Sequence, residues 1–231
     1  MWLPRPERYN SPVKQLVLDL IPAPAPTLAN FVVGRNQEAY AVVTGLLGGS
    51  AATGARVVYL WGEKGSGKTH LLTALGGDER GGFTVGVPAD DGQTAGVYVV
   101  DDVAALGEAA QQALFNLMNR VQMSGGVIVA TGSCAPRDLT LRRDLASRLG
   151  SGLVFQLQPL SEQERADALR VHAHTRGFAL REDVIGYLLR HARRDMATLM
   201  STLDALDAYS IETGREITLP LLKEVSQPML V

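Results

Sequence analysis

The sequence predicts an α/β fold: a parallel sheet covered by helices, followed by a small all-helical domain. Up to residue 157, short runs rich in β-branched residues alternate with helical patterns. From residue 161 onward only helical patterns follow. Strands that alternate with helices are typical of a parallel sheet buried on both faces. We therefore expect a flexible tail at 1–27, an α/β domain at 28–160 and a helical domain at 161–231.

The strands of the α/β domain are predicted from runs that are short, β-branched and bounded by glycine or polar residues. Four runs fit this description well, and a weaker one supplies the fifth strand of the expected five-stranded sheet. The strands are expected at 57–61, 83–87, 97–101, 127–131 and 154–157, with helices between them at 68–75, 108–123 and 142–148.

The helical domain is predicted from its capping signals. Ser161 and Glu164 have the spacing of a capping box, in which each residue satisfies the other's free N–H group. Gly177 and Gly214 lie where helices are expected to end. Helical patterns run to about 176, then over 181–192, 195–213 and 219–225.

Charge and composition exclude several classes of protein. The chain of 231 residues has 22 Lys and Arg against 24 Asp and Glu, a net charge of −2. Such a chain lacks the diffuse basic surface that drives non-specific nucleic-acid binding. Its one cysteine, Cys134, excludes an intramolecular disulfide and a cysteine-based zinc site. No apolar run approaches the roughly 18 residues of a membrane span, and no secretory signal is evident, so we expect a cytoplasmic protein.

The N-terminal tail combines proline with one apolar pattern. Six of the eleven prolines fall within the first 27 residues, which favours an extended segment. Residues 15–20 read Gln-Leu-Val-Leu-Asp-Leu. In an extended docking peptide, leucines fill apolar pockets and a glutamine fixes orientation. The alternative is a strand that packs on the chain's own domain. The candidate partner-binding residues are Gln15, Leu16, Leu18 and Leu20.

Residues 62–69 match the phosphate-binding loop G-x-x-x-x-G-K-[ST]. They read Gly62-Glu63-Lys64-Gly65-Ser66-Gly67-Lys68-Thr69. Glycines let backbone N–H groups turn toward phosphate oxygens, and the following helix adds its positive end. Lys68 would reach the β and γ phosphates, and Thr69 would place a hydroxyl on Mg²⁺. A glycine-rich turn without a ligand is the alternative, but the loop lies between a predicted strand and a predicted helix, as nucleotide binding requires.

Two carboxylates, Asp101 and Asp102, end the strand predicted at 97–101. In a parallel sheet this end lies on the ligand side. Asp101 could hold Mg²⁺ through water, and Asp102 could orient an attacking water. The alternative is that this pair caps the next helix, where Asp is favoured.

These features together resemble the AAA+ ATPases, over about residues 28–228. The usual order in that family is a phosphate loop, an acidic strand end, a polar strand end, an arginine and a helical lid. The polar strand end is Ala130-Thr131-Gly132-Ser133, at the sensor 1 position. Arg148 lies in the arginine box 144–149, and Arg194 lies at the sensor 2 position, with Arg193 as its competitor.

Within the AAA+ ATPases the sequence is similar to DnaA, the replication initiator, and its relatives. Residues 30–36 and the paired aspartates look like that family. DnaA carries a C-terminal helix-turn-helix domain, whereas this chain ends at Val231, directly after the expected lid. We therefore expect the Hda family of DnaA regulatory inactivators. The segments that resemble it are 15–20, 158–161, 176–178 and 198–204.

The resemblance implies a regulator that prevents re-initiation of DNA replication. Residues 15–20 would bind the sliding clamp, the beta subunit of DNA polymerase III. Arg148 would act in trans as an arginine finger on ATP bound to DnaA, although Arg142 and Arg143 are close enough to compete. DNA would be contacted only through the clamp and DnaA, and a homo-oligomer is possible.

The resemblance also implies a nucleotide and Mg²⁺. Ser133 replaces an acid or amide of many relatives, and Asp102 is shorter than the commoner Glu. Both changes favour slow hydrolysis, so ADP rather than ATP could occupy the site. The alternatives are an autonomous ATPase, of the DnaA-paralogue or helicase-loader type, and a non-catalytic recruitment module that keeps ADP. The expected nucleotide-binding residues are Phe31, Val33, Gly62, Gly65, Ser66, Gly67, Lys68, Thr69, His70 and Arg194, with Thr69 and Asp101 toward the metal.

Overall fold

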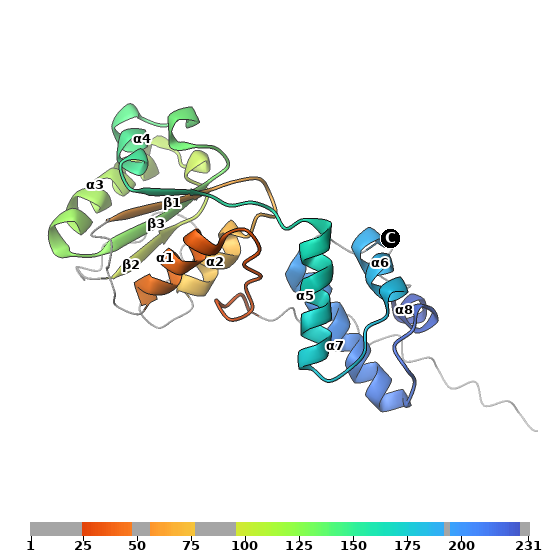
Figure 1. Cartoon of the computed structure of the whole chain (residues 1–231). Helices are drawn as coiled ribbons and strands as arrows, with labels where there is room; N and C mark the ends of the chain where they lie inside the picture. The colour runs from red at the N-terminus through yellow and green to blue at the C-terminus, as the bar shows by residue number, and fades with distance from the viewer. Residues whose placement is uncertain (1–24, 48–55, 77–95, 192–194, 227–231) are drawn as a thin grey trace, which may run out of the picture. The chain divides into compact units, whose positions relative to one another are not determined.

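The computed structural model of the chain describes residues 25–47, 56–76, 96–191 and 195–226. These residues form two compact units, one of which ends at Ala168 and the other of which begins at Leu169. The first unit holds a sheet with its helices, and the second is all-helical (Figure 1). The boundary between the units falls inside one helix, α5 (Glu162–Thr175).

The sheet of the first unit has four described strands in the order β2-β3-β1-β4. They are β1 (Val57–Trp61), β2 (Val97–Val100), β3 (Val127–Gly132) and β4 (Leu153–Gln156). Every neighbouring pair is parallel, so all four carboxyl ends meet at one edge. The predicted α/β fold with a parallel sheet is confirmed, and the fifth strand expected at 83–87 lies outside the described residues.

Alternate residues of the strands enter two separate cores, one on each face of the sheet. Tyr59 and Ile128 pack toward α3 (Glu108–Ser124) and α4 (Arg143–Gly150). Val58 and Val129 pack on the other face, toward α1 (Gln37–Leu47) and α2 (Lys68–Gly76). Figure 1 shows the sheet between these two helical layers. This period of two is what a sheet covered on both faces requires.

The helix α1 was not expected from the sequence. Its segment reads QEAYAVVTGLL, in which two valines, a threonine and a glycine lower the helix propensity. Ala39 and Val43, four residues apart, are buried in the core beside the sheet. Packing on the sheet therefore decides the conformation here, because the local propensity does not.

The second unit continues from α5 through α6 (Glu182–His191), α7 (Met196–Thr213) and α8 (Leu219–Ser226). The expected capping box is present: Glu164 N–H donates to Ser161 Oγ at 3.2 Å, and Ser161 N–H donates to Glu164 Oε2 at 2.7 Å. Gly177 and Gly214 have φ of 84° and 64°, left-handed values that suit the glycines predicted at these helix ends.

An ion-pair cluster joins α5 and α7 inside the helical unit. Arg176 Nε lies 3.2 Å from both Asp204 Oδ1 and Asp207 Oδ2. His172 Nε2 lies 2.7 Å from Asp204 Oδ1. Asp207 is buried, so its charge depends on Arg176 for compensation. None of the helices described in either unit is long and apolar enough to cross a membrane.

Candidate functional site

The candidate site lies at the carboxyl edge of the sheet, where three parallel strands end side by side. The phosphate loop follows β1, Asp101 follows β2, and Thr131 lies one residue before the end of β3. In open parallel sheets this edge is where ligands bind. The topology therefore brings together residues that are 30 or more positions apart in the sequence.

The phosphate loop has the strand before it and the helix after it that the sequence predicts. Gly65 and Gly67 have φ of 86° and 95°, which residues with a Cβ adopt only at a cost. A Cβ on Gly67 would lie 2.7 Å from the ring of Phe31, and a Cβ on Gly62 would clash with the backbone oxygen of Leu157. These glycines permit both the turn and the close packing beneath it.

Lys68 is folded back onto its own loop. Its Nζ donates to the backbone oxygens of Gly62 at 2.7 Å and Glu63 at 2.9 Å. Burial lowers the pKa of Lys68 from its ordinary value, and the opposing attraction of Asp101 and Asp102 does not cancel that effect. A half-buried ammonium of this kind gains from an anion placed beside it.

The loop fits a phosphate group. Ser66 is buried, and its Oγ has no hydrogen-bond partner in the described part of the chain. Lys68 begins α2, so the first N–H groups of this helix are free of helical partners and point toward the loop. An orphaned hydroxyl, a helix N-terminus and an ammonium together form a site for an anion.

A hydrogen-bonded chain links the ends of β2 and β3 to the start of α2. Thr69 Oγ1 donates to Asp101 Oδ2 at 2.9 Å. Thr131 Oγ1 donates to the other carboxylate oxygen, Asp101 Oδ1. The backbone N–H of Asp102 donates to Thr131 Oγ1 at 2.9 Å. The sequence expected Thr69 and Asp101 to lie together, and the structure places them in direct contact.

The oxygens of Thr69 and Asp101 suit Mg²⁺ that is shared with a nucleotide. They are too few to bind a metal ion without other ligands. No group of three or more His, Cys, Asp or Glu that could hold a metal is found in the described part of the chain. Mg²⁺ in nucleotide sites usually needs only one or two protein oxygens, because phosphate and water supply the rest. The site is therefore suited to a metal that arrives with a nucleotide.

Asp102 has an unusual backbone. Its φ of 47° is the only positive φ of a non-glycine residue in the described part of the chain. It occupies the N-cap position of the short helix η1 (Val103–Ala105), but its side chain makes no capping hydrogen bond. Its side chain is exposed. Helix capping, the alternative raised by the sequence, thus finds no support at Asp102.

The segment before α1 forms an aromatic wall against the loop. Phe31 stacks on Tyr40 with ring centroids 5.7 Å apart and lies 5.3 Å from the ring of His70. His70 Nε2 lies 2.9 Å from the backbone oxygen of Thr27. Val33 is half-buried in the same segment. Of the expected nucleotide-binding residues, Phe31 and His70 therefore contact each other, and Phe31 also lies against Gly67.

The same segment is also tied to the stretch that leads into α5. Asn36 Nδ2 donates to the backbone oxygen of Gln158 at 3.0 Å, and Gln158 N–H donates to Asn36 Oδ1 at 2.7 Å. Arg35 donates to the backbone oxygen of Pro159 at 3.0 Å and lies 3.7 Å from Glu164. Two segments more than 120 residues apart are thus joined beside the site.

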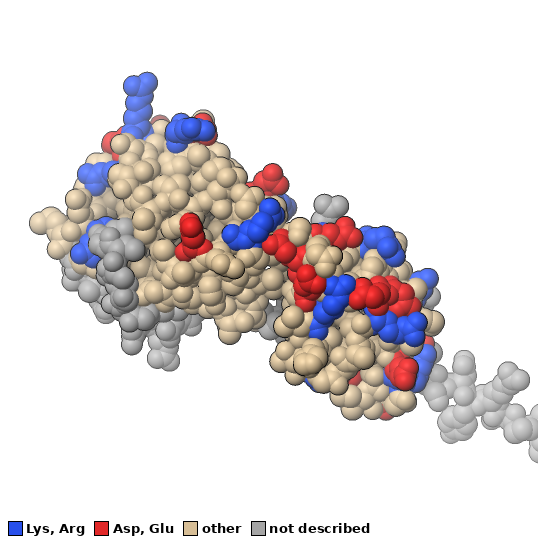
Figure 2. All heavy atoms as spheres, in the orientation of Figure 1, with Lys and Arg blue, Asp and Glu red and all other residues tan. Residues whose placement is uncertain are grey.

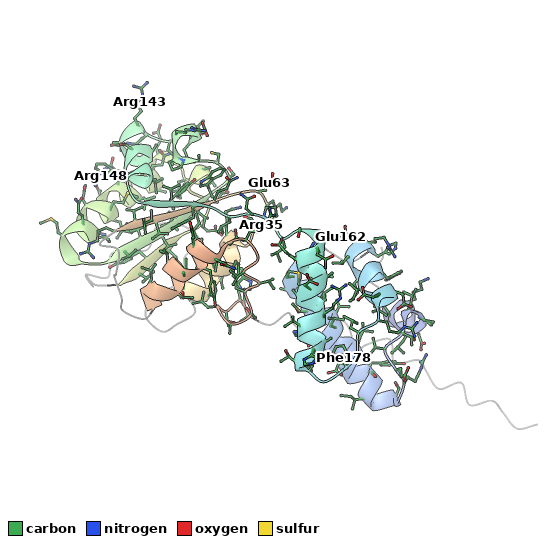
Figure 3. All side chains as sticks on the ribbon, in the orientation of Figure 1. Arg35, Glu63, Arg143, Arg148, Glu162 and Phe178 are labelled. Carbon is green, nitrogen blue, oxygen red and sulfur yellow. The ribbon has the colours of Figure 1, made fainter. Side chains whose placement is uncertain are left out.

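Three arginines lie on α4 or at its N-cap, and they differ in their contacts. Arg148 is half-buried, with its guanidinium 4.4 Å from the centroid of the Phe115 ring. Arg142 is held by Gln112 and by Asp144, the latter at 2.7 Å. Arg143 is exposed, and Figure 3 shows its side chain extended away from α4.

Some expected site residues cannot be placed. Gln15, Leu16, Leu18 and Leu20 lie outside the described residues, as do Arg193 and Arg194. Ser133 is described, and it is exposed just beyond β3.

Charged side chains gather over the helical unit in the face shown in Figure 2, while the sheet unit is mostly uncharged there. That face shows no broad basic surface.

Sequence reasoning missed three residues that the structure brings to the site. Thr131 was noted only as part of a polar strand end, yet its hydroxyl contacts both aspartates. Asn36 was included only as part of the segment 30–36, without a role of its own, and Phe115 was not singled out. The sequence signal that could have identified Thr131 is a single threonine near the end of an otherwise apolar predicted strand. The aspartate pair ends another predicted strand of the same sheet.

Comparison with known proteins finds one family model and several solved structures that resemble this chain. Residues 162–225 match the family model described as the lid domain of Hda. Domain III of the replication initiator DnaA from Thermotoga maritima is 23% identical, with 91% of this chain and 99% of that chain covered and a TM-score of 0.63.

Further solved structures share the fold. A DnaA bound to AMPPCP and single-stranded DNA is 23% identical, with 82% of this chain and 69% of that chain covered and a TM-score of 0.62. A RuvB variant from Thermotoga maritima is 14% identical, with 83% and 68% covered and a TM-score of 0.57. At these identities the likeness establishes the fold, and the AAA+ architecture expected from the sequence is confirmed.

Proposed function

We propose a function for this AAA+ protein, whose fold is that of DnaA domain III and whose residues 162–225 match the Hda lid domain. The protein binds an adenine nucleotide and acts as a regulator of DnaA. Docked on the DNA-loaded sliding clamp, it stimulates hydrolysis of the ATP held by DnaA and so prevents re-initiation. The match to the Hda lid is the observation that carries this proposal, because it distinguishes a regulator from the initiator itself.

The chain's own nucleotide site is supported by the geometry of the loop. Lys68, the orphaned Ser66 hydroxyl and the start of α2 would hold phosphate oxygens. Thr69 and Asp101 would hold Mg²⁺, which would neutralise phosphate charge. Phe31 and His70 would flank the base, and Arg194 would couple the lid to the phosphates. Relatives of this fold include DnaA bound to the nucleotide analogue AMPPCP.

Arg148 is the residue we propose to act on the nucleotide of a neighbouring DnaA. A guanidinium that reaches a transferring phosphoryl group stabilises its charge and raises the rate by about 10³–10⁵. Arg142 is less suited, because Gln112 and Asp144 already engage its guanidinium. Among the residues that the structure describes, Arg148 contacts the π-face of Phe115 and no hydrogen-bond partner of its guanidinium is found, which leaves the N–H donors available.

Clamp docking is proposed from the sequence of residues 15–20. An extended peptide with alternating leucines is a common ligand for apolar pockets on a partner. The clamp would then raise the local concentration of this protein beside DnaA on DNA. Gln15→Ala and Leu16→Ala are expected to weaken clamp capture without changing the chain's thermal stability.

The test of this function is the turnover of ATP bound to DnaA, with and without the DNA-loaded clamp. We expect the wild-type chain to speed conversion of DnaA-bound ATP to ADP only when the clamp is present. Clamp binding without any effect on DnaA would favour a non-catalytic recruitment module and would contradict the proposal.

The intact chain Thr69–Asp101–Thr131 supports a second candidate, an autonomous ATPase. Under this candidate the isolated protein hydrolyses ATP rapidly, and Lys68→Ala abolishes the activity. Under the leading proposal the isolated protein turns over slowly, because Ser133 offers only a short hydroxyl near the site and Asp102 is shorter than Glu. Turnover by the isolated protein, measured with no DnaA present, separates the two.

A further inference from the structure

The hydroxyl of Thr131 hydrogen-bonds to two successive aspartates, Asp101 and Asp102. Thr131 is fully buried and lies opposite Leu60 in the register of β3 with β1. Its Oγ1 accepts the N–H of Asp102 at 2.9 Å and donates to Asp101 Oδ1. A single side chain from the neighbouring strand thus contacts the backbone of one aspartate and the carboxylate of the other.

Packing alone does not account for a hydroxyl at this position. Valine has nearly the same shape, and a hydroxyl removed from water costs free energy unless it is hydrogen-bonded. The hydroxyl of Thr131 donates its one proton to Asp101 and accepts the N–H of Asp102 on one of its lone pairs. Because β-branched side chains are stiff at χ1, this hydroxyl is held in one direction by the strand itself.

The contacts divide the Asp101 carboxylate into two ends. Oδ1 receives the Thr131 hydroxyl and, at 3.1 Å, the N–H of Asp102. Oδ2 receives only Thr69 Oγ1 among the contacts found for the described residues, and it faces the start of α2. One oxygen is therefore fixed by the sheet, and the other is presented toward the phosphate loop.

We infer that Thr131 is a positioning residue for metal-assisted nucleotide binding: it orients Asp101 so that Oδ2 and Thr69 together accept Mg²⁺. The inference rests on the proposed nucleotide site. Some residues hydrogen-bond a metal ligand without contacting the metal. Removing such a residue typically lowers metal affinity about 10–100-fold. Thr131 also holds the N–H of Asp102, the residue with the left-handed backbone, and so keeps both aspartates in register.

The experiment measures ADP affinity by calorimetry in the full chain, once with Mg²⁺ and once with EDTA. The variants are Thr131→Val, which keeps the shape and removes the hydroxyl, and Thr131→Ser, which keeps the hydroxyl. In Thr131→Val we expect the gain in affinity from Mg²⁺ to fall about tenfold or more, while metal-free affinity stays within about twofold of wild type. Thr131→Ser should recover most of the gain.

A double variant tests whether Thr131 acts through Asp101. Asp101→Asn alone should abolish the Mg²⁺ gain, and adding Thr131→Val should then cause no further loss. If Thr131→Val does not fold, as judged by thermal unfolding, Thr131→Ala replaces it in the same comparison. An unchanged Mg²⁺ gain in the hydroxyl-free variant, or no recovery in Thr131→Ser, overturns the inference.

The result for the wild-type chain separates this inference from the proposed function. If the wild type fails to bind ADP under either condition, the proposed nucleotide site is wrong and the inference falls with it. If it binds ADP and responds to Mg²⁺ but Thr131→Val behaves like the wild type, only the inference is wrong.

Discussion

The Nζ of Lys68 lies 2.7 Å from the backbone oxygen of Gly62, and the same ammonium lies 2.9 Å from the backbone oxygen of Glu63. The lysine that should meet phosphate is therefore bonded to its own loop. An ammonium has three N–H donors, and these two bonds use two of them. A phosphate oxygen can accept from the third or replace one of the carbonyls, and its negative charge makes the contact with the ammonium favourable.

Lys68→Met is expected to lose nucleotide affinity by about 10–100-fold, since one charge-assisted hydrogen bond contributes about 1.5–3 kcal/mol. Fluorescent ADP titration measures the effect. Lys64→Met is the matched control, because Lys64 is an exposed lysine of the same loop. Equal losses in the two variants would show that overall charge, and not the contact made by Lys68, determines binding.

The lowered pKa of Lys68 predicts a dependence of stability on pH in the nucleotide-free chain. Burial disfavours the charged form in the folded state, so the unfolded chain binds more protons between the lowered pKa and the ordinary value of 10.5. Stability must rise with pH through that window. The stability of the wild type relative to Lys68→Met should therefore increase as pH rises toward 10.5. Urea unfolding of both proteins from pH 8 upward measures this difference, and a wild type that loses stability relative to the variant over that range would contradict the assignment.

Asn36→Asp should destabilise the sheet unit by about 1–3 kcal/mol. The new carboxylate keeps the bond from Gln158 N–H but sets an oxygen, in place of the amide donor, against the backbone oxygen of Gln158. Asn36 is buried, so water cannot relieve the mismatch. Gln37→Glu makes the same chemical change at the neighbouring exposed position and should have little effect on the urea midpoint.

Asp102 offers a test in which the sign of an effect reverses. Its left-handed φ costs an ordinary residue about 1–2 kcal/mol, a cost that glycine avoids. We expect Asp102→Gly to be more stable than Asp102→Ala by about 1 kcal/mol. At the exposed Ala104, two residues on, Ala104→Gly should instead be destabilising. Thermal unfolding compares glycine with alanine at each of the two positions. If the glycine protein is the less stable one at both, backbone strain at Asp102 is ruled out.

Local signals identified the parts of the site that are contiguous in sequence. The phosphate loop, the aspartate pair and the capping box of Ser161 with Glu164 each depend on fixed short spacings. The structure shows the strand and helix on either side of the loop, the contact of Asp101 with Thr69 and the reciprocal bonds of the capping box. The four strands that the structure describes were predicted to within a residue or two, because their runs are short and rich in β-branched residues.

Contacts between distant segments could not be predicted in the same way. The Thr131–Asp101 contact depends on β3 lying beside β2, and the Asn36–Gln158 pair joins residues more than 120 positions apart. The contact of Phe115 with Arg148 depends on how α3 and α4 pack on one face of the sheet. The helix α1 was missed because its valines and threonine favour a strand, and only burial of Ala39 and Val43 settles its form.

The trans-acting arginine is tested by Arg148→Ala in reconstituted reactions with DnaA, labelled ATP and DNA-loaded clamp. Loss of the Phe115 contact should cost only about 0.5–1 kcal/mol of stability, so the variant should fold and still bind clamp and nucleotide. Arg190→Ala, which removes an exposed arginine of α6, controls for the loss of one charge.

The most direct measurement of the central claim is the single-turnover rate at which DnaA-bound ATP is converted to ADP. We expect strong stimulation by the wild type and by Arg190→Ala, and a fall of at least about 100-fold in the stimulated rate with Arg148→Ala. Unchanged stimulation by Arg148→Ala would contradict the account and would show that Arg148 is not the residue acting on the DnaA nucleotide.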